Sequence, residues 1–188
     1  TRLVDMSQID DGVIKYDTRD FIEAPALEAS EYSELEYWRH KLYLIQLIGQ
    51  YLPEQIGYGN LSLKRNYLSF QETTQTQFVI TGTQTGGIEH LSGDHYTRVL
   101  SYDFKNWSVK AMGPLQASSE ALTHAAIYES NNKINAVFHI HSKEIWKGMI
   151  KENYPSTAEN TPYGTEEMAN EVIQKVGSSD RGIIVMKG

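Results

Sequence analysis

The chain has 188 residues and a formal net charge of −7 at pH 7, and 40% of its residues are hydrophobic. A chain of this length and composition can bury the core of one globular domain. The acidic balance argues against nucleic acid as the main partner, because binding to a phosphate backbone needs a basic surface. The chain has no cysteine, so any metal ion must be held by His, Asp or Glu side chains.

Neither a membrane span nor a secretory signal is apparent in the sequence. No run approaches the roughly 18 consecutive apolar residues of a spanning helix. The first residues also lack the charged-then-apolar pattern of a signal peptide. We therefore expect a cytoplasmic protein with no membrane partner.

The first 30 residues are polar and acidic, and we interpret them as an N-terminal extension of a domain at residues 31–188. A helix is predicted from Ser33 to Leu52, where Pro53 ends the apolar pattern. Its apolar residues recur at helical spacing, and the predicted buried face is Leu35, Trp38, Leu42, Ile45 and Ile48.

Short strands are predicted next, at residues 59–63, 78–81, 97–102 and 107–112. Helices are predicted at residues 119–130, 139–150 and 166–176, with a short strand at 136–138. Strands that follow one another as well as alternating with helices favour an α/β fold with a mixed or antiparallel sheet flanked by helices.

The last residues, 181–188, form an apolar, β-branched run that predicts a buried strand. Domains usually end in exposed, polar segments rather than at the tip of a core strand. We therefore expect the domain to be truncated here, with further sequence beyond Gly188.

The tripeptide His139-Ile140-His141 follows the apolar residues of the predicted strand. Side chains two apart in a strand leave the same face, so both imidazoles point the same way. Two neutral imidazoles on a rigid strand make half of a tetrahedral zinc site. The alternative is that both histidines simply alternate with core residues and form ordinary hydrogen bonds.

Two glycine-rich segments stand near predicted strands, at residues 57–62 around Asn60 and at residues 81–87. A Gly/Thr-rich loop that closes a strand offers free backbone N–H groups and hydroxyls, which can bind an anion. Either segment alone is more typical of an ordinary turn. Their spacing matches neither a Walker A motif nor a dinucleotide fingerprint, which argues against nucleoside triphosphates and NAD.

A third polar cluster, Ser118-Ser119-Glu120, opens the predicted helix at 119–130. Two hydroxyls and the exposed amides of a helix start can hold an anion, although either serine is also a natural N-cap. A carboxylate such as Glu120 in a metal pocket can be a ligand or a general base. His124 lies one turn later, and we favour a structural role for it at the rim of the helix.

Taken in order, these segments resemble the class II aldolase/adducin family. The resemblance rests on Gly59-Asn60-Leu61-Ser62, Ile80-Thr81-Gly82-Thr83-Gln84-Thr85-Gly86, Ser118-Ser119-Glu120 with His124, His139-Ile140-His141-Ser142 and Pro162-Tyr163-Gly164-Thr165-Glu166-Glu167. It covers roughly residue 33 to the end. It implies a three-layer α/β/α sandwich around a mainly antiparallel sheet, assembled as a homotetramer.

The resemblance also implies a function in carbohydrate metabolism and assigns roles to residues. The implied reaction is that of a zinc-dependent aldolase-type lyase, which acts on a phosphorylated ketose through an enediolate. His139 and His141 would be zinc ligands, and Glu120 would be the acid/base. The phosphate of the small sugar substrate would be held by Gly59, Asn60, Thr85, Gly86, Ser118 and Ser119.

Several points stay open within this resemblance. The family's third zinc histidine would lie beyond Gly188, and neither Tyr154 nor Tyr163 is assigned as the proton-donating tyrosine. Glu120 favours an aldolase over the epimerases, which carry aspartate at that place. The alternatives are a methylthioribulose-phosphate dehydratase-like enzyme and a non-catalytic, adducin-like binding or assembly module.

Overall fold

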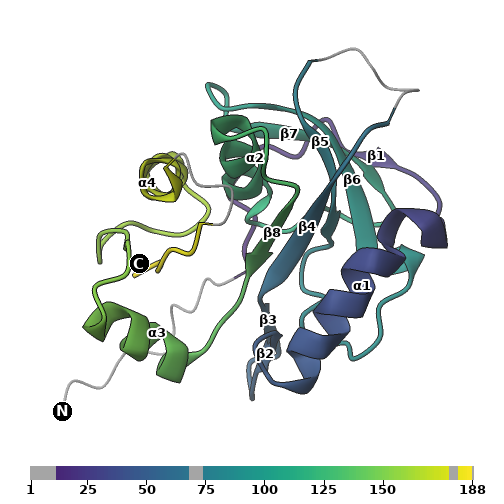
Figure 1. Ribbon diagram of the computed structural model, residues 1–188. Coiled ribbons are helices and arrows are strands. Elements are labelled where there is room, and N and C mark those ends of the chain that lie inside the picture. The colour runs from purple at the N-terminus through teal and green to yellow at the C-terminus, as the bar shows by residue number, and fades with distance from the viewer. Residues whose placement is uncertain (1–11, 68–73, 178–181, 188) are drawn as a thin grey trace.

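The computed structural model describes residues 12–67, 74–177 and 182–187 (Figure 1). At its centre is a six-stranded sheet with the strand order β1-β7-β6-β5-β4-β8. β1 pairs with β7 in parallel, and every other neighbouring pair is antiparallel. The strands are β1 (Ile22–Glu23), β4 (Asn60–Arg65), β5 (Gln77–Thr81), β6 (Tyr96–Asp103), β7 (Ser108–Gly113) and β8 (Ala136–His139). The predicted α/β class with a mainly antiparallel sheet is therefore confirmed.

Helices contact both faces of this sheet. The helices are α1 (Ala29–Leu44), α2 (Ala121–Ser130), α3 (Lys143–Lys151) and α4 (Glu166–Val176), with a short 3-10 turn at Gly93–His95. Of these, α1 contacts β4, and α2 contacts β6 and β7. On β5, Phe78 and Ile80 join the core cluster of α2 and α4, whereas Val79 joins the cluster of α1. This alternation is what a strand buried on both faces requires, and Figure 1 shows α1 and α2 apart on the two sides of the sheet. None of the helices in the described ranges has the length and apolar run needed to cross a bilayer.

The first helix differs from its prediction in both extent and orientation. It ends at Leu44, because Gln46 adopts a positive φ of 60° and the chain turns into the hairpin of β2 (Gly49–Tyr51) and β3 (Ile56–Tyr58). Trp38 is 48% exposed and Ile45 is 65% exposed, so the prediction that they are buried is wrong. The buried positions of the helix are Leu35 and Arg39.

The N-terminal segment contributes to the sheet where the structure describes it. Residues 1–11 of the predicted extension lie outside the described residues. Ile22 and Glu23 form the edge strand β1, and Tyr16 and Leu27 are buried. The segment from Gly12 onward is thus part of the packed structure.

Two predicted buried strands are less enclosed than expected. The strand at 136–138 forms as β8, but β8 lies at the edge of the sheet and Phe138 is 43% exposed. Of the run 181–188, Arg181 and Gly188 lie outside the described residues. The rest makes a single bridge from Val185 to Ser156 in a loop, and Ile183 is 62% exposed. The prediction of a strand there is wrong for residues 182–187, because their backbone contacts that loop and not the sheet.

The last two predicted helices are present. α4 matches its predicted range of 166–176. The helix predicted from residue 139 begins at Lys143, because β8 extends to His139 and Ser142 then caps the helix by accepting a hydrogen bond from the N–H of Ile145.

Candidate active site

One cavity of about 1060 Å³ brings together all the residues that the sequence singled out for chemistry. Its lining includes Gly59, Asn60, Thr85, Gly86, Ser118, Ser119, Glu120, His139 and His141. These residues come from four segments that are far apart in the chain. The volume is at the upper end of the range for small-molecule sites, roughly 300–1,000 Å³.

The register of β4 and β8 places an amide beside an imidazole. Asn60 is the first residue of β4, and it lies opposite His139, the last residue of β8. Gly59 precedes it with a φ of 80°, and a Cβ there would lie 2.7 Å from Cγ1 of Ile48. Only glycine fits this turn without displacing its neighbours.

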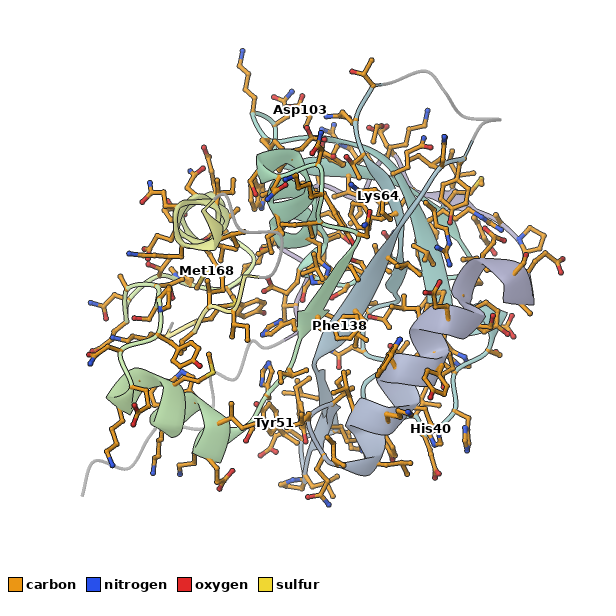
Figure 2. The ribbon with its side chains drawn as sticks, viewed as in Figure 1. His40, Tyr51, Lys64, Asp103, Phe138 and Met168 are labelled. Carbon is orange, nitrogen blue, oxygen red and sulfur yellow. The ribbon has the colours of Figure 1, made fainter. Side chains whose placement is uncertain are left out.

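The two histidines lie side by side, as a strand geometry predicts. Their ring centroids are 4.9 Å apart. The hydroxyl of Tyr51 lies 2.7 Å from Nδ1 of His141, and the ring of Tyr58 stacks on His141 at 5.2 Å. Both tyrosines belong to the β2–β3 hairpin, and Figure 2 labels Tyr51 below β8. The hairpin therefore fixes the orientation of the His141 ring.

Burial keeps the imidazoles of His139 and His124 neutral. It lowers the pKa of His139 to about 4 and that of His124 to about 3. A neutral imidazole is the form that binds a metal ion. Nδ1 of His139 is 3.4 Å from the amide nitrogen of Asn60, whose buried Oδ1 has no hydrogen-bond partner among the described residues. Turning the amide by 180° would let Oδ1 accept from Nδ1–H, which is how ligating histidines are commonly oriented.

The loop after β5 is held from behind by a buried cation. Arg39 on α1 is 1% exposed and donates to the carbonyl oxygens of Thr85 (3.3 Å), Gly86 (3.1 Å) and Glu89 (2.6 Å). In a planar trans peptide the carbonyl and the next N–H point in opposite directions. The N–H of Gly86 therefore points away from α1, on a residue that lines the cavity. This is the arrangement that an anion-binding loop needs.

The third segment leads from β7 into α2 and lies beside the end of β5. The N–H of Ser118 donates to the carbonyl of Thr81, and the hydroxyl of Ser118 accepts from the N–H of Glu120 at 3.3 Å. Glu120 is 3% exposed and stands at the start of the helix. The segment thus brings two hydroxyls and a buried carboxylate to the wall of the cavity.

His124 lies deeper than predicted. It is 1% exposed and not at a rim, because every residue of α2 from Ala121 to Tyr128 is buried. Its Nδ1 is 2.7 Å from the hydroxyl of Ser62, which also contacts the hydroxyl of Tyr128 at 2.8 Å. This buried network has the structural role that the sequence favoured, although His124 also lines the cavity.

The donor set of the cavity fits a divalent metal in part. Two imidazoles are borderline ligands that suit zinc, and also manganese, cobalt or nickel when no thiolate is present. Glu120 does not complete a three-ligand group with them. Among the described residues, one group of three His, Cys, Asp or Glu side chains has ligand atoms that all lie within 4.8 Å of one another. That group is His40, Glu89 and His90, and it lies outside the cavity.

Sequence reasoning missed several residues that shape the site. Arg39 stands four residues after Leu35 on the same helix face, but its partners lie in a loop about 50 residues further along the chain, so no local signal identified its role. The contacts of Tyr51 and Tyr58 with His141 could not be predicted, because Tyr51 was expected in a helix and Tyr58 in a glycine-rich turn. Lys15 and Tyr163 also line the cavity, and Nζ of Lys15 donates to the carbonyl of Tyr163 at 3.1 Å.

The sequence was compared with curated proteins and with models of protein families. No curated protein matches the chain in sequence. A family model, the Class II Aldolase and Adducin N-terminal domain, matches residues 43–188. This match spans the loops, the helix start and the histidine pair that line the cavity, so the chain belongs to the class II aldolase/adducin family.

Proposed function

We propose that this protein is a metal-dependent lyase of the aldolase type that acts on a phosphorylated ketose through an enediolate. One observation carries the proposal: a single cavity collects a histidine pair, a buried carboxylate and an anion-binding set of amides and hydroxyls. A lyase that acts on a sugar phosphate uses all three groups, for the metal, the proton and the phosphate. A binding module would need no carboxylate in the same cavity as the histidines.

The phosphate site is the best-formed part of the cavity. The amide of Asn60, the N–H of Gly86 and the hydroxyls of Ser118 and Ser119 offer donors to a phosphate, and the start of α2 adds its positive end. The hydroxyl of Thr85 already donates to the carbonyl of Gly82 at 2.9 Å. Thr85 therefore contributes mainly by shaping the loop. The turn at Gly59 lets Asn60 approach the cavity.

Glu120 is the candidate acid/base. A carboxylate that is 3% exposed lies in a medium of low dielectric, where moving a proton to or from a neighbouring carbon is less opposed by solvent. In the proposed reaction it removes or returns the proton that interconverts ketose and enediolate. A divalent ion, zinc in this proposal, would be held by His139 and His141 and would supply the Lewis acid that polarises the ketose carbonyl.

A panel of ketose phosphates tests this proposal. The protein is incubated with zinc, dihydroxyacetone phosphate and a range of aldehydes, and in the reverse direction with ketose 1-phosphates. Carbon–carbon bond formation or cleavage supports the aldolase. Loss of water from methylthioribulose phosphate would instead identify a dehydratase, and no reaction across the panel would favour the adducin-like module.

Metal content tests the histidine pair independently of turnover. The purified protein and its His139→Ala variant are compared by elemental analysis after dialysis against a weak chelator. We expect the variant to lose bound zinc, because one of two neighbouring imidazoles is gone. Equal metal content in the two proteins would show that the pair is structural.

We also propose that the protein is a homo-oligomer, with the family's tetramer as the expected form. Large apolar side chains are exposed along and just after α1, where Tyr37, Trp38, Leu44 and Ile45 are each at least 48% exposed. Exposed apolar patches of this kind mark protein–protein contacts. Light scattering on the purified protein measures the assembly, and a monomer at micromolar concentration would contradict it.

A further inference from the structure

A second group of metal-ligating side chains lies outside the cavity. His40 is on α1, and Glu89 and His90 are in the loop after β5. One ligand atom of each lies within 4.8 Å of those of the other two. None of the three lines the cavity, and Figure 2 labels His40 beside α1, away from Tyr51.

The three side chains lie close together, but their ligand atoms form no hydrogen bond of normal length with one another. Nε2 of His40 is 3.7 Å and Nε2 of His90 is 3.5 Å from the same oxygen of Glu89, Oε1. Both distances exceed the range of an N–H···O hydrogen bond, about 2.7–3.2 Å. Nε2 of His40 is also buried, and it has no hydrogen-bond partner in the described parts of the chain. A buried nitrogen of this kind is unusual unless something else binds it.

The spacing is close to that of a zinc ion's ligands. With metal–ligand distances of about 2.0–2.1 Å, a tetrahedral site holds its ligand atoms roughly 3.3–3.4 Å apart. The observed distances of 3.5 and 3.7 Å to Oε1 of Glu89 exceed this spacing by only a few tenths of an ångström, and the ligand atoms of the two imidazoles lie within 4.8 Å of each other. Two imidazoles and one carboxylate are also a ligand set that leaves a fourth position for water or a further ligand.

The cluster is held in place by contacts that do not involve its ligand atoms. Arg39, the residue before His40, donates to the backbone carbonyl of Glu89 at 2.6 Å. The hydroxyl of Tyr43, one turn later, contacts the carbonyl of Gly87 at 3.4 Å. The segment that carries two ligands is thus tied to the helix that carries the third, which limits the reorganisation that binding would require.

We propose that His40, Glu89 and His90 form a second divalent metal site, for zinc, separate from the His139 and His141 pair. An ion there joins α1 to the end of the loop whose Thr85 and Gly86 line the cavity. It therefore stabilises that loop without taking part in the reaction. The site does not depend on the proposed lyase activity.

Zinc titration of variants tests the proposal. In the full-length protein carrying His139→Ala and His141→Ala, calorimetry should still detect one bound zinc per chain. Adding His90→Ala should weaken this binding by at least about 100-fold, since even the loss of an outer partner of a ligand costs 10–100-fold. Glu89→Gln should do the same, and Glu159→Gln, which removes an exposed carboxylate elsewhere, should leave it unchanged.

Cobalt offers a spectroscopic check of the geometry. Titration of the same double variant with Co²⁺ should give the intense visible bands of a four-coordinate site, and His90→Ala should abolish them. His90 and Glu89 are exposed, so the substitutions should leave the thermal unfolding of the metal-free protein unchanged. Absence of stoichiometric zinc in the double variant, or zinc affinity that His90→Ala does not change, would overturn the proposal. Either result would leave the lyase proposal standing.

Discussion

Replacing Arg39 by methionine should destabilise the protein strongly, because one buried guanidinium holds three carbonyl oxygens of the loop after β5. A hydrogen bond to a charged group contributes about 1.5–3 kcal/mol, so three give roughly 5–9 kcal/mol. Several kcal/mol of this are offset, because methionine avoids the cost of burying a charge. We therefore expect Arg39→Met to lower the free energy of unfolding by about 2–4 kcal/mol.

Urea denaturation followed by circular dichroism measures this loss. With a slope of about 2 kcal/mol per molar urea, the midpoint should fall by roughly 1–2 M at unchanged slope. The urea midpoint of Arg39→Lys should lie between those of the wild type and Arg39→Met, since an ammonium cannot reach three carbonyls at once. Arg19→Met is the control, because the Arg19 side chain is 88% exposed and its ion pair with Asp17 lies at the surface. A midpoint for Arg39→Met within about 0.3 M of the wild type would refute the assigned role of Arg39.

Three further predictions concern acid stability and two glycines. Arg98 donates hydrogen bonds to both carboxylate oxygens of Glu31 at 2.6 Å. Burial acts to raise the pKa of Glu31, but the hydrogen bonds outweigh this effect and hold the pKa below the ordinary 4.5. The resulting stability is present above pH 4.5 and is lost as the pH falls through the lowered pKa, so the urea midpoints of Glu31→Gln and wild type should converge once the pH is below that lowered pKa. Gly86→Ala should destabilise by more than about 2 kcal/mol, because its Cβ would lie 2.2 Å from the carbonyl oxygen of Gly49. Gly148→Ala in α3, where a Cβ meets nothing within 4 Å, should stabilise by about 0.5–1 kcal/mol in the same assay.

Local sequence patterns predicted the four strands β4 to β7 and the helix α4 well. Alternation and turn residues located β4, β5, β6 and β7 to within one or two residues, and α4 matched its predicted range. These elements are fixed by short-range signals, namely period-2 burial, a threonine cap and glycine after the last turn. The sequence also identified the residues that the fold gathers around one cavity.

The failures have a common physical cause, which is that burial is decided by distant partners. On α1, Trp38 and Ile45 have apolar side chains at helical spacing, yet the sheet and the loop after β5 contact the face of Leu35 and Arg39. A buried arginine satisfied by three loop carbonyls cannot be inferred without knowing where that loop lies. The Tyr51 contact with His141 likewise joins segments 90 residues apart.

The rate and stability of Glu120→Gln test the central claim most directly. The change keeps the shape of a side chain that is 3% exposed and removes its ability to accept a proton. If Glu120 is the acid/base, turnover of the ketose phosphate should fall by about 10²–10⁴-fold, and the urea midpoint should stay close to that of the Glu159→Gln control. A carboxylate that only favours the start of a helix contributes about 0.3–1 kcal/mol to stability and nothing to rate. A Glu120→Gln variant that retains most of its turnover would contradict the account.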